Sequence, residues 1–261
     1  MCKRKFMGVF NKIPINLKFP IKKLFYFGTY FHCLACNCRI RRFEPAGVDH
    51  EAVIKYQIIG GGFYSESLCP VCRSTYRDRL IMWYLKFKID KKILKNGKII
   101  HIAPEYTLYR YLKRNKNYYC GDIDLRKYPK FKQFVKIDIV DAAFDKNTFD
   151  LIICNHVLEH IPDDQKAMKE IYRILKPGGI AILQVPISKK LLTTYEDDTI
   201  SEPDARQREF GQKDHVRIYG QDYPKRLLNA GLKVEIVVPA NGFNYRKHGI
   251  NKEERLFVCT K

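Results

Sequence analysis

The amino-acid sequence predicts an α/β protein built on a mainly parallel, doubly wound sheet, with a small cysteine-bearing module ahead of it. Beyond Gly97, short β-rich runs alternate with amphipathic helices, the pattern of parallel strands that are joined by helical crossovers. Ahead of that stretch stand two C-x-x-C pairs with 32 residues between them. Two such pairs indicate one metal centre more specifically than a single pair does.

The composition excludes several classes of protein. The chain has 261 residues, of which 46% are hydrophobic and 29% are charged, a balance that rules out a disordered, collagen-like or low-complexity chain. No apolar run approaches the roughly 20 residues that span a bilayer, and the start does not resemble a cleaved signal. We therefore expect a cytoplasmic protein with reduced cysteines. The 48 basic and 28 acidic residues give a net charge of +20, which attracts anionic partners.

Residues 1–32 form a basic and aromatic leader with seven basic side chains and no acidic one. This mixture predicts either peripheral contact with an anionic membrane, at its inner face, or a solvated leader that packs on the protein body. The basic residues are Lys3, Arg4, Lys5, Lys12, Lys18, Lys22 and Lys23, and they alternate with Phe6, Phe10, Phe19, Phe25, Tyr26 and Phe31.

Residues 33–95 are predicted to form a zinc-ribbon-like module and a linking helix. Four thiolates around a tetrahedral ion match the preference of Zn²⁺, and a site with four protein ligands is closed and structural. The expected ligands are Cys33, Cys36, Cys69 and Cys72. Cys38 and His32 are alternative ligands, and the 32-residue separation is longer than in a compact zinc ribbon.

The linking helix is predicted to start at Ser74-Thr75, because apolar residues recur at helical spacing from Tyr76 onward. Arg77 and Arg79 follow on this helix and, being two residues apart, do not share a face. We expect one of them either to bind an anionic substrate or to tie the module to the main domain.

Residues 96–261 carry the predicted sheet. Its strands and helices follow one another in the order strand 98–103, helix to about 113, strands 118–123, 134–139 and 149–156, helix from about 163, strand 180–187, helix 224–230, and strands 233–238 and 255–260. Pro177 is expected to end the helix before the fifth strand, with Gly178 or Gly179 as its cap.

Polar residues stand where these strands end, and in an open doubly wound sheet ligands bind outside the carboxyl ends of the strands. Asp122 comes nineteen positions after Ala103, at the distance expected of an acceptor for ribose hydroxyls, and Asp124 is the alternative. The sequence has neither a dinucleotide-binding glycine pattern nor a P-loop. A nucleoside cofactor without phosphates is compatible with both observations.

The stretch FDLIICNHVLEH and the later LKPGG resemble motifs IV and V of class I S-adenosylmethionine-dependent methyltransferases, of the type 11-like group. The resemblance covers about residues 97–261. CPVCRSTYRDRL and FGQKDHVRIYGQDY are similar to a subset that often looks like bacterial surface-polysaccharide or sugar-modifying enzymes.

The resemblance implies a Rossmann-like, seven-stranded methyltransferase sheet that binds S-adenosyl-L-methionine. It implies that Asp122 accepts from the ribose hydroxyls and that Asp138 accepts from the adenine amino group, with Ile139 packed on the ring. Asn155 and His156 would lie beside the methionine end.

The first turn departs from the family pattern, which has an acidic residue followed by three alternating glycines. This chain has His101-Ile-Ala-Pro-Glu105 instead. Because glycine normally allows the backbone to approach the cofactor closely, Ala103, Pro104 and Glu105 have to form this part of the cofactor site.

Transfer to a hydroxyl acceptor needs a base, and histidine is the side chain that titrates near neutral pH. His215, oriented by Asp214, is the first candidate, and Arg217 is a candidate ligand for an acidic group of the acceptor. These residues lie in a long polar segment of the kind that often forms lids. His156 is the second candidate, with Glu159 and His160 beside it.

Three functions remain open on the sequence alone. The first is methylation of a small-molecule or sugar acceptor in the biosynthesis of cell-surface polysaccharide. This acceptor is either neutral or anionic. The second is methylation of rRNA or tRNA, because the net charge of +20 also suits nucleic acid. The third is a non-catalytic scaffold with the same fold.

Overall fold

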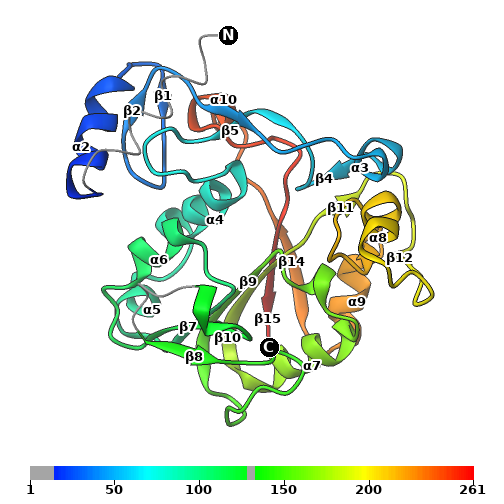
Figure 1. The fold of residues 1–261 in the computed structure, drawn as a ribbon. Coiled ribbons are helices and arrows are strands. Elements are labelled where there is room, and N and C mark those ends of the chain that lie inside the picture. The colour runs from blue at the N-terminus through cyan, green and yellow to red at the C-terminus, as the bar shows by residue number, and fades with distance from the viewer. Residues whose placement is uncertain (1–14, 128–132) are drawn as a thin grey trace.

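The computed structural model describes residues 15–127 and 133–261, so the leader residues 1–14, which include Lys3, Arg4, Lys5 and Lys12, lie outside the described residues. A seven-stranded sheet in the order β14-β15-β10-β9-β6-β7-β8 forms the centre of the molecule (Figure 1). Its strands are β6 (Ile99–Ile102), β7 (Tyr118–Asp122), β8 (Phe134–Lys136), β9 (Phe149–Asn155), β10 (Leu175–Gln184), β14 (Lys233–Val237) and β15 (Leu256–Thr260).

The order of the strands confirms the doubly wound fold. β6 pairs in parallel with β7 on one side and with β9 on the other, so the chain proceeds outward from β6 in both directions. β15 is antiparallel to both β10 and β14. The carboxyl ends of β6, β7 and β9 therefore share one edge of the sheet, at the point where the strand order reverses.

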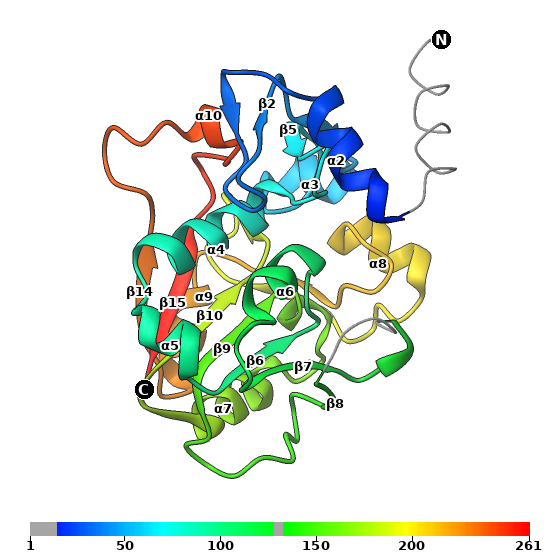
Figure 2. The same cartoon turned by 90° about the vertical axis from the view of Figure 1, so that its left-hand side faces the viewer.

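Helices cover both faces of the sheet, because the central strands are apolar along their whole length and successive side chains point to opposite faces. Ile152 and Cys154 pack toward α7 (Asp164–Ile174) and α9 (Tyr223–Asn229). Leu151 and Ile153 pack on the other face, toward the helices that Figure 2 shows in front of the sheet. These are α4 (Tyr76–Phe87), α5 (Lys91–Asn96) and α6 (Tyr106–Leu112).

The starts of α4 and α7 agree with the sequence. Thr75 caps α4 in a reciprocal capping box with Asp78, and Asp163 accepts a hydrogen bond from the backbone of Lys166 at the start of α7. The expected end of α7 was wrong. The helix ends at Ile174 and β10 begins at Leu175, before Pro177, because the residue that precedes a proline avoids the helical conformation.

Gly178 therefore does not cap a helix. It has φ of +73° inside β10, where the pairing with β9 shifts register between Leu175 and Ile180. The Pro-Gly-Gly sequence forms an irregularity in a strand, which glycine accommodates because it has no Cβ.

The N-terminal part of the described chain forms a small layer above the sheet, at the top of Figure 1. It contains α2 (Ile15–Phe25), β1 (Phe31–His32), β2 (Arg39–Ile40), β3 (Glu44–Ala46) and β5 (Tyr64–Leu68). Phe19 and Tyr26 pack against the cluster of buried cysteines and aromatic rings in this layer. Phe19 and Tyr26 of the leader thus pack on the protein body, and β1, which ends at the predicted boundary at residue 32, pairs with β2 beyond it.

Residues 51–59 pack on a different part of the molecule. α3 (Glu51–Tyr56) contacts α8 (Pro203–Phe210), and β4 (Ile58–Ile59) pairs with β11 (Ile187–Ser188). Figure 1 shows these four elements together beside the sheet. α3, α8 and β4 were not expected from the sequence, because each is short and gains its stability from tertiary contacts, and Ile187 of β11 was assigned to the predicted strand 180–187.

Arg79 is the residue that ties the small layer to the sheet domain, as one of the two sequence interpretations expected. Its guanidinium is fully buried and donates to the carbonyl oxygens of Ser67, Ser74, His248 and Gly249. His248 belongs to α10 (Tyr245–His248), which precedes the last strand. Within the described ranges, no helix has the length and apolar character needed to cross a bilayer.

Candidate functional site

A cavity of about 370 Å³ opens at the carboxyl ends of β6, β7, β8 and β9, and we call it the cofactor pocket. Five of the residues predicted to bind the cofactor line it: Ala103, Asp122, Asp138, Ile139 and His156. Ile102, Ile137 and Val157 add apolar wall between the polar groups. A pocket with apolar sides and carboxylates at its ends suits a nucleoside.

The remaining residues predicted to bind the cofactor, Pro104, Glu105 and Asn155, are not part of the pocket lining. Glu105 is held by the buried His101, whose Nε2 lies 2.7 Å from Glu105 Oε2, and it also accepts a hydrogen bond from Asn155. Glu105 and Asn155 therefore support the first turn from behind the pocket wall.

The first turn replaces glycine by Ala103 without changing the backbone conformation that glycine favours. Ala103 has φ of +47°, in the left-handed region that costs a residue with a Cβ about 1–2 kcal/mol. Its methyl group is the smallest side chain that can line the pocket there.

Asp122 and its alternative Asp124 differ in their surroundings. The Asp124 carboxylate holds the exposed guanidinium of Arg126 at 2.9 and 3.1 Å and is not part of the pocket lining. Asp122 ends β7, is buried, and has Lys127 Nζ 3.7 Å from its Oδ1. Of the two carboxylates, Asp122 is the one that faces the pocket.

A larger cavity of about 660 Å³ adjoins the cofactor pocket, and Asp214 lines both. Its walls come from segments that are far apart in the sequence: the backbone of residues 60–62, residues 46–53 with Ser67, the start of α4, the loops after β9 and β10, and the end of α8 with the residues that follow it. The polar side chains that line it are His50, Ser67, Thr75, Arg77, Glu159, Gln207, Gln212, Lys213, Asp214, His215 and Arg217. The glycine run at 60–62 is the only sequence signal for the first of these walls.

A buried polar cluster separates the two cavities. Arg77 donates from Nη1 to His156 Nδ1 at 2.8 Å and to the carbonyl oxygen of Gly60 at 2.8 Å. Because a guanidinium can only donate, His156 Nδ1 accepts and its proton is on Nε2. Glu159 Oε1 is also 3.2 Å from His156 Nδ1, but this nitrogen has no proton left to donate to it.

Glu159 is therefore a buried carboxyl group without a hydrogen bond. It is 1% exposed, and neither of its oxygens has a hydrogen-bond partner among the residues that the structure describes. Burial raises its pKa to about 8, because a carboxylate loses its hydration in the interior. Burial and the nearby Arg77 charge lower the pKa of His156 well below its usual value.

Glu254 is a second buried carboxyl group near this cluster. It accepts a hydrogen bond from Gln184, and burial raises its pKa to about 7. Gly60, with φ of +86°, passes so close that a Cβ there would lie 3.3 Å from Glu254 Oε1 and 3.3 Å from His156 Cε1. The positive φ and the close approach to these two side chains both favour glycine at this position.

The predicted pairing of Asp214 with His215 was wrong. Asp214 Oδ2 lies 3.3 Å from Nδ1 of His160, whereas His215 Nδ1 lies 3.3 Å from the carbonyl oxygen of Phe210. His160, in the loop after β9, lies next to the Asp214 carboxylate in place of His215. His215 is buried beside the larger cavity, and burial, with the neighbouring His160, lowers its pKa to about 4.

The guanidinium of Arg217 is not available to bind a methyl-acceptor substrate, contrary to the sequence interpretation. It donates to Glu196 Oε2 at 2.8 Å, to Leu158 O at 3.0 Å and to Pro162 O at 2.7 Å, and it is 3% exposed. These contacts attach residues 189–222, which we call the lid segment, to the loop after β9. The lid segment also contains β12 (Tyr195–Glu196) and β13 (Arg217–Ile218).

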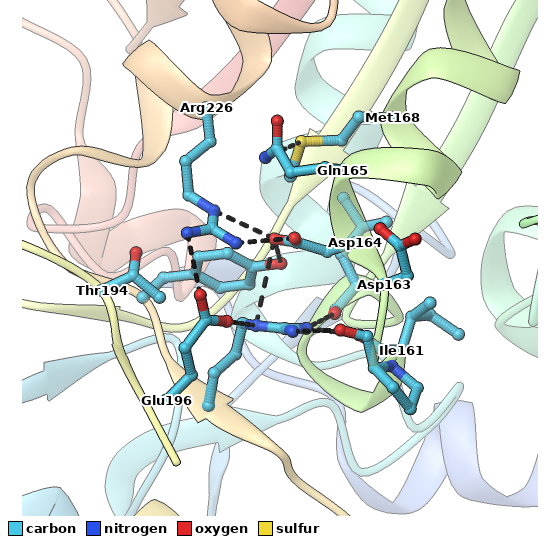
Figure 3. Close-up of polar contacts among 12 residues, drawn as sticks. Ile161, Asp163, Asp164, Gln165, Met168, Thr194, Glu196 and Arg226 are labelled. Carbon is cyan, nitrogen blue, oxygen red and sulfur yellow. Dashed lines mark hydrogen bonds and ion pairs between the residues drawn. The ribbon is translucent and has the colours of Figure 1, made fainter. Parts of the chain in front are cut away.

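The attachment continues around Asp164 at the start of α7. Arg226 of α9 holds Asp164 Oδ1 at 2.6 Å and Glu196 Oε1 at 3.2 Å, as Figure 3 shows. The buried Tyr219 hydroxyl donates to Asp164 Oδ2 at 2.7 Å. These ion pairs share partners around the buried Asp164 carboxylate, so they fix the lid segment more firmly than separate surface pairs would.

Four cysteine sulfurs meet in the small layer, and they belong to the four residues expected to bind metal. Cys33 Sγ lies 3.7 Å from Cys72 Sγ, and Cys36 Sγ lies 3.8 Å from Cys69 Sγ. Four sulfurs at Zn–S distances of about 2.3 Å stand roughly 3.8 Å apart in a tetrahedron. Cys38 is outside this group and directs its sulfur to the carbonyl oxygen of Cys36, while His32 contacts Asn37.

Comparison with known proteins agrees with the central part of this description. Residues 107–183 match the family described as "Methyltransferase domain". Over 69 residues the chain is 33% identical to a demethylmenaquinone methyltransferase of Staphylococcus epidermidis, which covers 24% of this chain and 29% of that enzyme. Over 114 residues it is 36% identical to the chloroplastic 2-phytyl-1,4-beta-naphthoquinone methyltransferase of Arabidopsis thaliana, covering 42% and 41% of the two chains.

The chain thus matches less than half the length of each of these two relatives. Among solved structures, an S-adenosylmethionine-dependent methyltransferase from Mesorhizobium loti superposes with a TM-score of 0.49 at 11% identity. The superposition covers 71% of this chain and 100% of that chain.

Proposed function

Because the chain carries a class I methyltransferase domain, we propose that it transfers a methyl group from S-adenosyl-L-methionine to a small-molecule acceptor. The observation that carries the proposal is the pair of adjoining cavities, one at the strand ends where this fold binds ligands and one beside it. Both relatives described above are named for small-molecule acceptors.

The residues of the cofactor pocket match the chemical groups of the cofactor. Asp122 and Asp138 offer carboxylates for the ribose hydroxyls and the adenine amino group, and Ile139 offers an apolar surface for the ring. When bound, S-adenosylmethionine supplies an activated methyl group on a sulfonium centre. The protein then has to hold the acceptor in line with that methyl group.

The acceptor is proposed to bind in the larger cavity, where hydrogen-bonding side chains and exposed backbone both occur. This mixture suits a molecule with several hydroxyl groups, and a sugar of a cell-surface polysaccharide is the specific acceptor that the sequence resemblance favours. The roles of His215, His156 and Asp214 in removing the acceptor proton stay predictions. So do the cytoplasmic location and the contact with an anionic membrane.

The cysteine group is proposed to hold a structural Zn²⁺. The sulfur separations of 3.7 and 3.8 Å match a tetrahedral thiolate site, and three of the four cysteines are buried. The ion would fix the small layer, from which the larger cavity receives part of its wall.

RNA methylation is the second candidate function, favoured by a separate observation. A third cavity of about 500 Å³, beside α5 and α6, is lined by five basic side chains: Lys86, Lys91, Lys95, Arg110 and Arg114. Such a basic surface suits a phosphate backbone. Retention on RNA that falls steeply as salt rises would favour this function over a small-molecule acceptor.

The proposal is tested by calorimetric titration of the full chain with S-adenosylmethionine and S-adenosylhomocysteine. Micromolar binding is expected, and screening with a methyl-labelled cofactor then follows, with sugars before RNA. A folded, metal-loaded sample that binds neither ligand would reject the enzyme and favour the scaffold.

A further inference from the structure

We propose that Glu159, His160 and His215 form a second metal site, which binds a divalent first-row transition ion between the cofactor pocket and the larger cavity. One potential ligand atom from each residue lies within 4.8 Å of the other two. The binding of the ion stands by itself, and only its purpose rests on the proposed function.

The first argument is the chemistry of the ligand set. Two imidazoles and one carboxylate hold catalytic zinc in several enzymes and leave a coordination position open. Glu159 is 1% exposed, and both of its oxygens lack a hydrogen-bond partner within the described part of the chain. A bound cation supplies the positive partner that a buried carboxylate requires.

The second argument is the support behind each imidazole. His160 Nδ1 lies 3.3 Å from Asp214 Oδ2, and His215 Nδ1 lies 3.3 Å from the carbonyl oxygen of Phe210. Each Nδ1 thus faces an acceptor and carries the proton, which leaves Nε2 for a metal. Histidine ligands are commonly oriented by a carboxylate or a carbonyl oxygen in this way.

The third argument is that the neighbouring histidine is already engaged. His156 Nδ1 accepts from Arg77, so the proton of this ring is on Nε2 and no lone pair is left for a metal. The arrangement therefore selects His160 and His215. The rings of these two histidines stand 4.7 Å apart, nearly perpendicular. Ligand atoms around one tetrahedral ion lie about 3.3 Å apart. The ligand atoms of these side chains therefore have to move roughly an ångström closer together when the ion binds.

The site bears on the choice of acceptor, because Glu159 and His215 both line the larger cavity. A metal ion with an open coordination position there would bind an oxygen of the acceptor and polarise it as a Lewis acid. The acceptor oxygen forms its bond to the methyl carbon as the sulfur–carbon bond breaks, sulfur keeps the electron pair, and the acceptor proton leaves to solvent. His215 would then act as a ligand and not as the free base that the sequence suggested.

The experiment is a titration of the full chain with Co²⁺, followed by visible absorption and by metal analysis. Cobalt bound by cysteines gives intense thiolate charge-transfer bands, whereas cobalt bound by nitrogen and oxygen gives only weak visible bands. We expect two bound metals per chain, one of each kind. His215→Gln and Glu159→Gln should each keep the sulfur-bound metal and bind the other at least tenfold more weakly.

His50→Gln is the matched control, because His50 lines the same cavity outside the cluster, and it should bind both metals like the wild type. A wild-type chain that binds only the sulfur-ligated metal overturns the proposal, as does a second metal that survives both substitutions unchanged. S-adenosylmethionine binding, measured on the same samples, separates failure of the metal site from failure of the proposed function.

Discussion

The cofactor pocket and the larger cavity adjoin each other but are assembled in different ways. The cofactor pocket is made chiefly from the ends of four neighbouring strands, β8, β7, β6 and β9, and the residues that follow them, all between Ile102 and Ile161, with Asp214 as the exception. The larger cavity is lined by residues from seven separate segments, none of which is a strand of the seven-stranded sheet: 46–53, 58–62, Ser67, 75–77, Glu159, Pro186 and 207–218. The pocket thus depends on the sheet, whereas the cavity depends on how the small layer and the lid segment are attached to it.

The strongest test of this difference removes the anchor of the small layer. Cys69→Ser should unfold this layer, because structural zinc supplies about 10–16 kcal/mol in isolated zinc-binding peptides. Limited proteolysis should then cut within residues 28–72, while the affinity for S-adenosylmethionine changes less than about threefold, a step of under 1 kcal/mol.

Cys38→Ser is the matched control, since Cys38 is buried in the same layer but outside the sulfur cluster. It should leave the layer resistant to protease. Cofactor binding that disappears together with the layer would show that the two regions form one cooperative unit.

The next largest effect concerns the lid segment. Arg217→Met removes one of the two guanidinium groups that hold Glu196 and leaves the carbonyl groups of Leu158, Ile161 and Pro162 without this donor. Each buried acceptor that is left unsatisfied costs about 1–3 kcal/mol. Hydrogen exchange should accelerate across residues 189–222. In Lys213→Met, which removes an exposed pair with Asp204, it should not change, and equal exchange in both variants would contradict the assigned role of Arg217.

Glu254, whose carboxyl group lies beside Gly60 behind the wall of the larger cavity, gives the stability of the chain a dependence on pH. Its pKa is raised from 4.5 to about 7 in the folded chain, so the native state holds a proton that the unfolded state releases between these values. The free energy of unfolding should therefore fall, by about 3 kcal/mol, as pH rises from 4.5 through 7.

Urea denaturation at pH 4.5 and pH 8 measures this dependence. Glu254→Gln should remove that part of the fall and be the more stable protein at pH 8, because the amide stays neutral. Glu253→Gln is the control, since Glu253 is exposed and pairs with Lys189. If Glu254→Gln shows the same fall as the wild type, the assignment of this titration to Glu254 is wrong.

The smallest effect is the most selective one. Asp122→Ala should weaken S-adenosylmethionine binding roughly 10- to 100-fold, since a hydrogen bond to a charged group contributes about 1.5–3 kcal/mol. Asp124→Ala should change it less than twofold, because Asp124 faces Arg126 outside the pocket. Calorimetry distinguishes the two variants, and a reversed order would make Asp124 the ribose acceptor.

The strands and helices that the sequence predicted are those with a clear hydrophobic pattern or a clear capping residue. Buried strands such as β9 are continuous apolar runs, and the caps at Thr75 and Asp163 depend on residues only three positions away. The missed elements, such as α3, α8 and β4, are short and depend on one another. Their local sequence has no period strong enough to indicate them.

The candidate site divides in the same way. The sequence alone determined that Asp122, Asp138 and His156 stand at neighbouring strand ends, because parallel strands place their carboxyl ends at one edge. It also predicted the four cysteines that meet, since each pair places two sulfurs close together, but only the tertiary structure placed Cys38 and His32 outside the group.

Only the tertiary structure decided the partners of the remaining polar groups. It paired Asp214 with His160, directed Arg217 to backbone carbonyls, and brought Arg77 to His156. Each of these contacts joins residues more than 50 positions apart, and such a choice depends on which loops the packing of whole elements brings together. The hydrophobic pattern of a few neighbouring residues determines where a strand ends. Which side chains from different loops pair with each other depends on how whole elements are buried against one another, and no local pattern encodes that.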